Sequence, residues 1–146
     1  MLREITFADL DRLEELEKIC FLKSPWNKQM LKESISFTNV YKVCLEQDGV
    51  IIAYLIAGYN NWEAEIFTIG VDVPYRKQGF ARKLLCALKD FCVSLNKEAI
   101  FLEVRNSNVS AISLYKNFGF KEISIRKNYY ENTEDAIIME LKIDKS

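Results

Sequence analysis

The sequence predicts a single α/β domain, residues 1–146, with a mixed, mostly antiparallel central sheet flanked by helices. Apolar residues recur at helical spacing in some stretches and form short continuous runs in others, so helices and strands both occur. Asp48-Gly49, a strong hairpin signal, lies between two apolar runs. With 49% hydrophobic and 28% charged residues, and with no repeat or linker, the 146 residues suit one core.

The first quarter of the chain predicts a short strand at Leu2–Thr6 and two helices. The first helix is indicated by apolar residues at helical spacing, namely Leu10, Leu13, Leu16 and Ile19. Ser24-Pro25-Trp26-Asn27 interrupts this spacing, and Asn27 is an expected N-cap for a second helix that extends to Ile35.

A three-stranded meander follows the helices. Val40–Glu46 and Val50–Tyr59 flank the turn Gln47-Asp48-Gly49, and Asn60-Asn61 leads into a strand at Trp62–Val71.

The second half predicts helix, strand, helix and two strands. A long helix at Phe80–Leu95 and a strand at Ala99–Val104 come first. Asn106-Ser107-Asn108 then caps a helix that Gly119 closes. The last two strands are expected at Phe120–Arg126 and Ala136–Ile143, around a polar loop at 127–135.

Composition excludes several classes of function. A net charge of −1 argues against a general nucleic-acid binder, and the longest apolar run, Val50–Ala57, is too short to span a membrane. The charged N-terminus is unlike a signal peptide, so we expect a cytoplasmic protein. The chain has no histidine, and its four cysteines lack zinc-site spacing, so we predict no metal site and no histidine-based catalysis. Cys20, Cys44, Cys86 and Cys92 all have apolar neighbours and are expected to be buried, reduced thiols.

The segment Arg76–Arg82 is a candidate anion site. Lying between a strand and a helix, it can direct free amide groups of the helix's first turn at a bound pyrophosphate, with cations nearby. It lacks the Gly-Lys-Ser/Thr of a P-loop and the three glycines of a dinucleotide fold. Gly79 alone could equally serve the geometry of an ordinary strand-to-helix turn.

Three polar residues in the second half are candidates for chemistry, each with a structural alternative. Glu103 is an ionisable residue in an otherwise apolar strand. It can be a base that faces a cleft, or a structural carboxylate paired with Arg105 or with a neighbouring strand. Tyr115 shares a helix face with apolar residues and can be a core ring or an acid. Asn108 is well placed as a helix cap.

The order of elements, together with the Arg76-x-x-Gly79-x-Ala81 loop, resembles the GNAT acetyltransferases. Several blocks resemble the ribosomal-protein-alanine N-acetyltransferase branch of that family, namely Pro25-Trp26, Leu102-Glu103-Val104-Arg105-x-Ser107-Asn108, Ala111-Ile112-x-Leu114-Tyr115, Phe118-Gly119-Phe120, Arg126-Lys127-Asn128-Tyr129-Tyr130 and Glu134-Asp135-Ala136-Ile137-Ile138-Met139.

The resemblance implies roles for individual residues, with acetyl-CoA as cosubstrate. Glu103 would be the general base, and Tyr115 the acid that protonates the departing thiolate. The backbone of Ile69, Gly70 and Val71 would pair with the pantetheine arm and supply an oxyanion donor. The pyrophosphate would be cradled by the loop Lys77, Gln78, Gly79, Phe80, Ala81 and Arg82. Asn108 would hydrogen-bond the cofactor.

Two positions depart from the family pattern, Ala81 from the commoner glycine and Gly70 from a frequent alanine. Ala81 is tolerable if its backbone does not need a positive φ.

By the same resemblance, the acceptor is the N-terminal α-amine of a protein, an alanine of a small-subunit ribosomal protein. The alternatives are another amine, such as a lysine side chain, a polyamine or another small amine, or a non-catalytic acyl-CoA sensor. Tyr129 and Tyr130 are as consistent with packing as with substrate contact. We expect a monomer without nucleic-acid or membrane partners.

Overall fold

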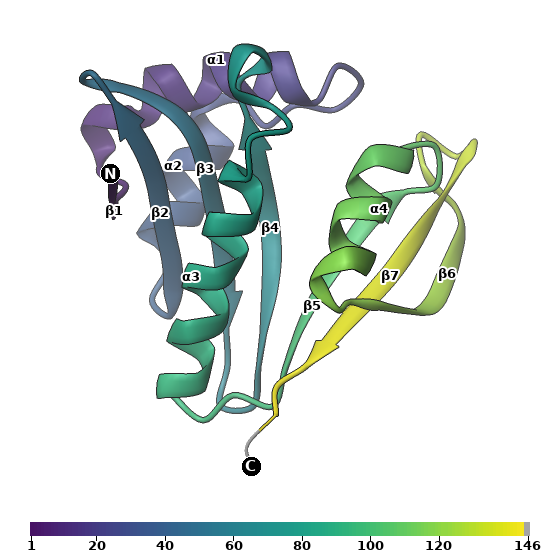
Figure 1. Ribbon diagram of the computed structural model, residues 1–146. Coiled ribbons are helices and arrows are strands. Elements are labelled where there is room, and N and C mark those ends of the chain that lie inside the picture. Colours follow the sequence, from purple (N-terminus) through teal and green to yellow (C-terminus); the bar gives the residue numbers. More distant parts are fainter. Residues whose placement is uncertain (145–146) are drawn as a thin grey trace. The chain divides into compact units, whose positions relative to one another are not determined.

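The computed structural model describes residues 1–144, and Figure 1 shows the α/β arrangement of helices and strands. Seven strands form one mixed sheet in the order β1-β2-β3-β4-β5-β7-β6. β4 and β5 pair parallel, whereas β1–β2, β2–β3, β5–β7 and β6–β7 pair antiparallel, so the predicted mixed, mostly antiparallel sheet is confirmed. In chain order the elements are β1 (Leu2–Glu4), the 3-10 helix η1 (Phe7–Asp9), α1 (Leu10–Cys20), α2 (Lys28–Ser36), β2 (Val40–Gln47), β3 (Val50–Tyr59), β4 (Glu63–Val71), the 3-10 helix η2 (Val73–Tyr75), α3 (Phe80–Ser94), β5 (Ala99–Arg105), α4 (Val109–Phe118), β6 (Lys121–Tyr130) and β7 (Glu134–Lys142).

Backbone contacts divide the chain into two compact units. Unit 1 comprises Met1–Tyr59 and Phe67–Leu88, and unit 2 comprises Asn60–Ile66 and the chain from Lys89 onward. No helix within residues 1–144 is long and apolar enough to cross a membrane.

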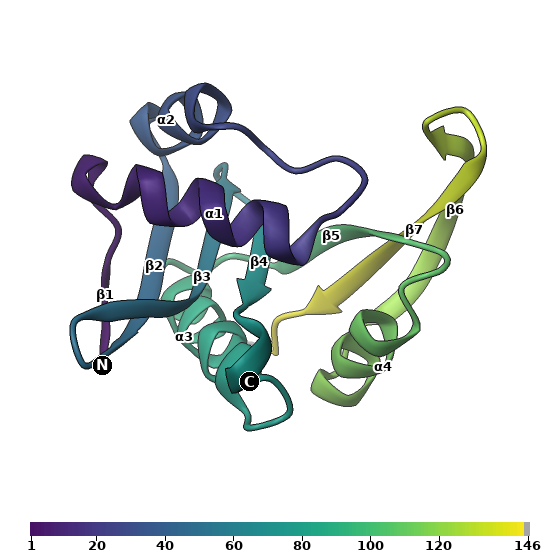
Figure 2. The same cartoon turned by 90° about the horizontal axis from the view of Figure 1, so that it is seen from above.

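Unit 1 is built around the β2–β3 hairpin. Figure 2 shows α1 and α2 on one face of this hairpin and the beginning of α3 on the other. Asp48 and Gly49 adopt φ angles of 52° and 78°, the left-handed pair that a two-residue hairpin of type I′ requires. α1 buries Leu10, Leu13 and Leu16 against the strands, as its spacing predicts.

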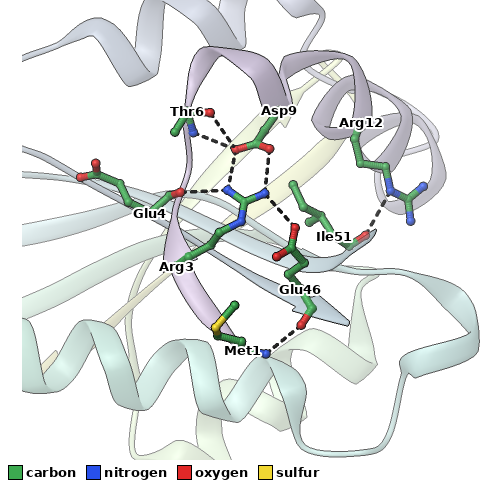
Figure 3. Close-up of polar contacts among 8 residues, drawn as sticks. All are labelled: Met1, Arg3, Glu4, Thr6, Asp9, Arg12, Glu46 and Ile51. Carbon is green, nitrogen blue, oxygen red and sulfur yellow. Dashed lines mark hydrogen bonds and ion pairs between the residues drawn. The ribbon is translucent and has the colours of Figure 1, made fainter. Parts of the chain in front are cut away.

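Two side chains, Asn27 and Asp9, hold the starts of the helices of unit 1 by hydrogen bonds. The side-chain oxygen of Asn27 accepts the Met30 amide at 2.9 Å, which confirms Asn27 as the N-cap of α2. Before α1, the Asp9 carboxylate accepts two hydrogen bonds of 2.9 Å from Arg3 and one of 2.8 Å from the Thr6 amide, as Figure 3 shows. Hydrogen bonding to the Arg3 guanidinium lowers the pKa of Asp9. This cluster ties β1 to the start of the helical segment.

Unit 2 is organised around β5, β7 and α4. The β5–β7 ladder runs in register from the Ala99–Lys142 pair to the Arg105–Ala136 pair. Asn108 caps α4 by accepting the Ala111 amide at 3.2 Å, and Gly119 ends it with a φ of 120°. Both helix boundaries were predicted from the sequence.

Two details of the sequence interpretation are wrong. The polar stretch 127–135 is not one loop, because β6 continues to Tyr130 and β7 begins at Glu134. β6 is an edge strand, where polar side chains can face solvent, and Asp135 supports its register shift by accepting the Asn128 amide at 2.9 Å. Of the four cysteines, only Cys44 and Cys92 are buried. Cys86 is exposed because it lies outside the stripe of α3 that contains Leu84, Leu85, Leu88 and Cys92.

Candidate active site

The predicted site residues fall into two groups, one in each unit. Unit 1 holds Ile69, Gly70 and Val71 together with the loop from Lys77 to Arg82. Unit 2 holds Glu103, Asn108 and Tyr115. The residues proposed to bind the pantetheine arm and the pyrophosphate therefore lie in unit 1. The two candidate proton-transfer groups, Glu103 and Tyr115, lie in unit 2.

The C-terminal end of β4 is held by side chains of unit 1. The Val71 carbonyl accepts a hydrogen bond of 2.9 Å from Arg76 Nε and one of 3.5 Å from the Cys20 thiol. Burial raises the pKa of this thiol, although its contact with Arg76 opposes the rise, so Cys20 remains a protonated donor at neutral pH. Arg76 thus contacts the strand through Nε, and its expected contribution of a cation to the loop stays a prediction.

The loop from Lys77 to Gly79 has the backbone form of an anion site. Lys77 and Gly79 have φ angles of 61° and 86°, and residues 77–79 are exposed. Alternation of left- and right-handed residues turns successive amide groups toward one side. The amides of the first turn of α3, which begins at Phe80, have no acceptor within the helix. Ala81 has no positive φ, so the methyl group at this departure from the family pattern is conformationally acceptable.

Gly70 is required by its surroundings. A Cβ at this position would lie 2.8 Å from Tyr54 Cε1, and 2.9 Å from both Cys20 Sγ and the Tyr54 hydroxyl. Tyr54 is fully buried, so the space beneath Gly70 is already filled. Glycine replaces the family's frequent alanine at position 70 because Tyr54 and Cys20 pack directly against this backbone and leave no room for a methyl group.

Glu103 lies on β5 opposite Ile138 of β7. Its side chain is 21% exposed, and one carboxylate oxygen lies 3.5 Å from Nη1 of Arg126 in β6. Arg105, the partner considered from the sequence, instead pairs with Glu131 and Glu134 at 2.7 and 3.2 Å. Glu103 is therefore a partly exposed carboxylate beside a cation and not a sealed ion pair.

Tyr115 is buried in α4, with 7% exposure, and packs edge-on against Phe120 with ring centroids 5.8 Å apart. Burial, followed by the charge of Tyr130, raises the pKa of Tyr115. The hydroxyl is thus protonated at neutral pH, which is the state that a proton donor requires. Asn108 acts as a helix cap, and its role toward a cofactor stays a prediction.

Three residues to which the sequence assigned no catalytic role interact with Glu103 or Tyr115. The first is Tyr130, because burial and then the charge of Glu103 raise its pKa to about 12. Tyr130 in turn contributes to the raised pKa of Tyr115. Glu65 of β4 pairs with Phe101, which puts it on the same strand face as Glu103. Burial and then Glu103 raise the pKa of Glu65. Arg126 is the third, since it contacts Glu103 directly.

A signal for one of these residues exists in the sequence. That residue is Glu65. Glu63 and Glu65 alternate with Ala64 and Ile66, which indicates that one face of this strand is polar at the start of the strand. The contacts of Arg126 and Tyr130 depend on the β6–β7 register, which no local pattern reveals. Within residues 1–144, no group of three or more His, Cys, Asp or Glu side chains could hold a metal ion.

The chain is similar to known acetyltransferases both in sequence and in fold. The model of the acetyltransferase (GNAT) family matches residues 10–120. A Haemophilus ducreyi protein named ribosomal protein bS18-alanine N-acetyltransferase is 38% identical over 145 residues, which span 97% of this chain and 99% of the relative. The crystal structure of the Escherichia coli ribosomal-protein-S18-alanine N-acetyltransferase superposes with a TM-score of 0.91 at 34% identity, covering 100% of this chain and 95% of that one.

A more distant structure shows what the fold alone leaves open. An aminoglycoside 6'-N-acetyltransferase complexed with coenzyme A superposes with a TM-score of 0.85, covering 99% of this chain and 97% of that chain, but is only 14% identical. This likeness concerns the fold only. Since one fold serves acceptors as different as a protein and an aminoglycoside, the acceptor must be argued from closer relationships.

Proposed function

The chain belongs to the acetyltransferase (GNAT) family, and we propose that its acceptor is the N-terminal alanine of a ribosomal protein, with acetyl-CoA as the acetyl donor. The observation that carries this proposal is the 38% identity to a bS18-alanine N-acetyltransferase along almost the full length of both chains. The identity extends through both units and is not confined to the loop that would bind acetyl-CoA.

The cofactor would be bound by unit 1. Ile69, Gly70 and Val71 would present strand backbone to the pantetheine arm, with an amide group available to the oxyanion. The exposed amides of Lys77–Gly79 and the first turn of α3 would hold the pyrophosphate, because both the open N–H groups and the helix dipole favour an anion there.

The chemistry would be carried by unit 2. An N-terminal ammonium must lose a proton before its nitrogen can attack, and Glu103 would accept that proton, directly or through water. The new C–N bond forms as the C–S bond of the thioester breaks, and the electron pair leaves on sulfur as a thiolate. Tyr115 would protonate this thiolate and then recover its proton from solvent or from the proton released at the amine.

An α-amine suits a carboxylate base better than a lysine does. Its reference pKa is about 8, against about 10.4 for a lysine ammonium, so less free energy is needed to deprotonate it near neutral pH. A small first residue such as alanine would also give the amine the shortest approach to the thioester. We further infer a cytoplasmic location, where a ribosomal protein is synthesised.

A peptide panel tests the proposal. Initial rates would be measured with acetyl-CoA and peptides that begin with alanine, serine or methionine, and with an N-terminally blocked peptide that contains lysine. We expect the alanine peptide to have the highest kcat/KM. A preference for the lysine peptide, or for a polyamine included in the same series, would contradict the proposed acceptor. Binding of acetyl-CoA without any transfer would favour a sensor.

A further inference from the structure

Glu17 of α1 is a buried carboxylate that the chemistry above does not use. It is only 1% exposed and lies in unit 1. Oε1 accepts the Trp26 amide at 2.9 Å, whereas Oε2 accepts the Thr68 hydroxyl at 2.6 Å and the Tyr54 hydroxyl in a short hydrogen bond. One side chain thus joins α1 to the α1–α2 segment, to β3 and to β4.

The three partners of Glu17 are neutral donors. An ionised carboxylate only accepts, so all three contacts agree with the charged form. Burial, and then the charge of Glu17, raises the pKa of Tyr54, which keeps its hydroxyl a donor. A carboxylate held in this way has little freedom, because turning it would leave a buried donor without an acceptor.

Glu17 and its neighbours contact a short stretch of β4. Thr68 directly precedes the Ile69–Val71 backbone, and Cys20, three residues beyond Glu17 in α1, donates to the Val71 carbonyl. The Trp26 ring also packs against Phe67 of the same strand, with centroids 6.3 Å apart. The segment 21–27 is therefore fixed to β4 through the Glu17 carboxylate and the Trp26 ring.

We propose that Glu17 is a positioning residue that sets the α1–α2 segment, residues 21–27, in place for the acceptor. This inference rests on the proposed function, in which the acceptor amine attacks a thioester held beside Ile69–Val71, and residues 21–27 are attached to that same stretch of β4. β4 has further attachments, because Asp72 donates its amide to the Ile52 carbonyl at 2.8 Å and pairs with Arg12 at 2.9 Å. Loss of Glu17 should therefore displace the segment more than the strand, and should affect the peptide more than acetyl-CoA.

Glu17→Gln tests this assignment, because the amide keeps the shape but cannot accept from both sides at once. We expect the KM for an alanine-terminated peptide to rise at least tenfold and the KM for acetyl-CoA to change less than threefold. Hydrogen exchange of the Trp26 amide, followed by NMR without any substrate, should become at least tenfold faster.

Asp9→Asn is the matched control. Asp9 is another buried carboxylate of unit 1 that accepts from a backbone amide, but it precedes α1 and contacts Arg3 and Thr6. Both variants lose stability, but only Glu17→Gln should change the peptide KM and the Trp26 exchange rate. Equal behaviour of the two variants would overturn the proposal.

Two further results keep the test decisive. If Glu17→Gln does not fold, Thr68→Val removes one donor and should raise the peptide KM at least threefold with the acetyl-CoA KM unchanged; no rise would refute the inference. If the wild-type protein does not acetylate the peptide, the proposed function fails, whereas the Trp26 exchange rate still shows whether Glu17 holds the segment.

Discussion

Gly70→Ala is expected to destabilise the protein by overpacking. The added methyl carbon would lie 2.8 Å from Tyr54 Cε1 and 2.9 Å from Cys20 Sγ, which is closer than side-chain carbons are found. Tyr54 cannot move aside easily, because it is fully buried and its hydroxyl is bound to Glu17. The backbone of β4 must therefore shift, and this is the backbone proposed to hold the pantetheine arm.

The magnitude follows from the cost of forcing a methyl group into a filled core. Overpacking costs about 1–3 kcal/mol, so we expect about 2 kcal/mol here. For a chain of this size that corresponds to a fall in melting temperature of roughly 4–8 °C. Thermal unfolding followed by circular dichroism measures the fall, and calorimetry of acetyl-CoA binding should show weaker affinity in the folded variant.

A second variant checks the cause. Cys20→Ala removes the sulfur atom that the new methyl group meets. Combined with Gly70→Ala, it should recover about 1 kcal/mol relative to the sum of the single changes, as expected for residues in contact. A Gly70→Ala protein that melts at the wild-type temperature would refute the packing argument, and additive single effects would exclude Cys20 as the obstacle.

Three other predictions concern the loop, the chemistry and the response to acid. Gly79→Asp places a negative side chain at a left-handed position of the anion loop, and acetyl-CoA affinity measured by calorimetry should fall at least tenfold, or about 1.4 kcal/mol; unchanged affinity would remove the loop from the binding site. Glu103→Gln and Tyr115→Phe should each lower turnover by roughly 10²-fold while acetyl-CoA affinity is retained, and near-normal turnover would leave that residue a structural role. Because Arg3 lowers the pKa of Asp9, this carboxylate contributes stability above its ordinary pKa of 3.8, and the contribution disappears as the pH falls through the lower folded value. Asp9→Asn should therefore be less stable at neutral pH and lose less stability on acidification, measured as urea midpoints against pH; parallel curves would contradict the assignment.

Local signals in the sequence predicted most boundaries in this fold. Asn27 and Asn108 cap helices, Asp48-Gly49 forms the hairpin turn, and Gly119 ends α4, because each feature depends on a few neighbouring residues. The same approach predicted the first part of β6 but failed for residues 127–130, where a polar composition suggested a loop. An edge strand needs one partner and no apolar face, so its pairing with β7 is invisible to hydrophobic patterning.

The candidate site was only partly predictable for a similar reason. Glu103 and Tyr115 stood out because each is a polar group in an apolar pattern. That Arg126, and not Arg105, lies beside Glu103 depends on the register of β6 against β7 and of β7 against β5. The contacts of Glu17 likewise join residues up to 51 positions apart. Such distant contacts follow from the assembled sheet and leave no mark in a local window of sequence.

The acceptor is the central claim, and one measurement addresses it most directly. A peptide with a free N-terminal alanine and one internal lysine would be incubated with acetyl-CoA and the protein, and tandem mass spectrometry would locate the added acetyl group. We predict a single acetyl group on the alanine α-amine, formed at a rate proportional to enzyme concentration. Acetylation mainly of the lysine, or of neither amine while a polyamine in the same mixture is modified, would contradict the proposed function.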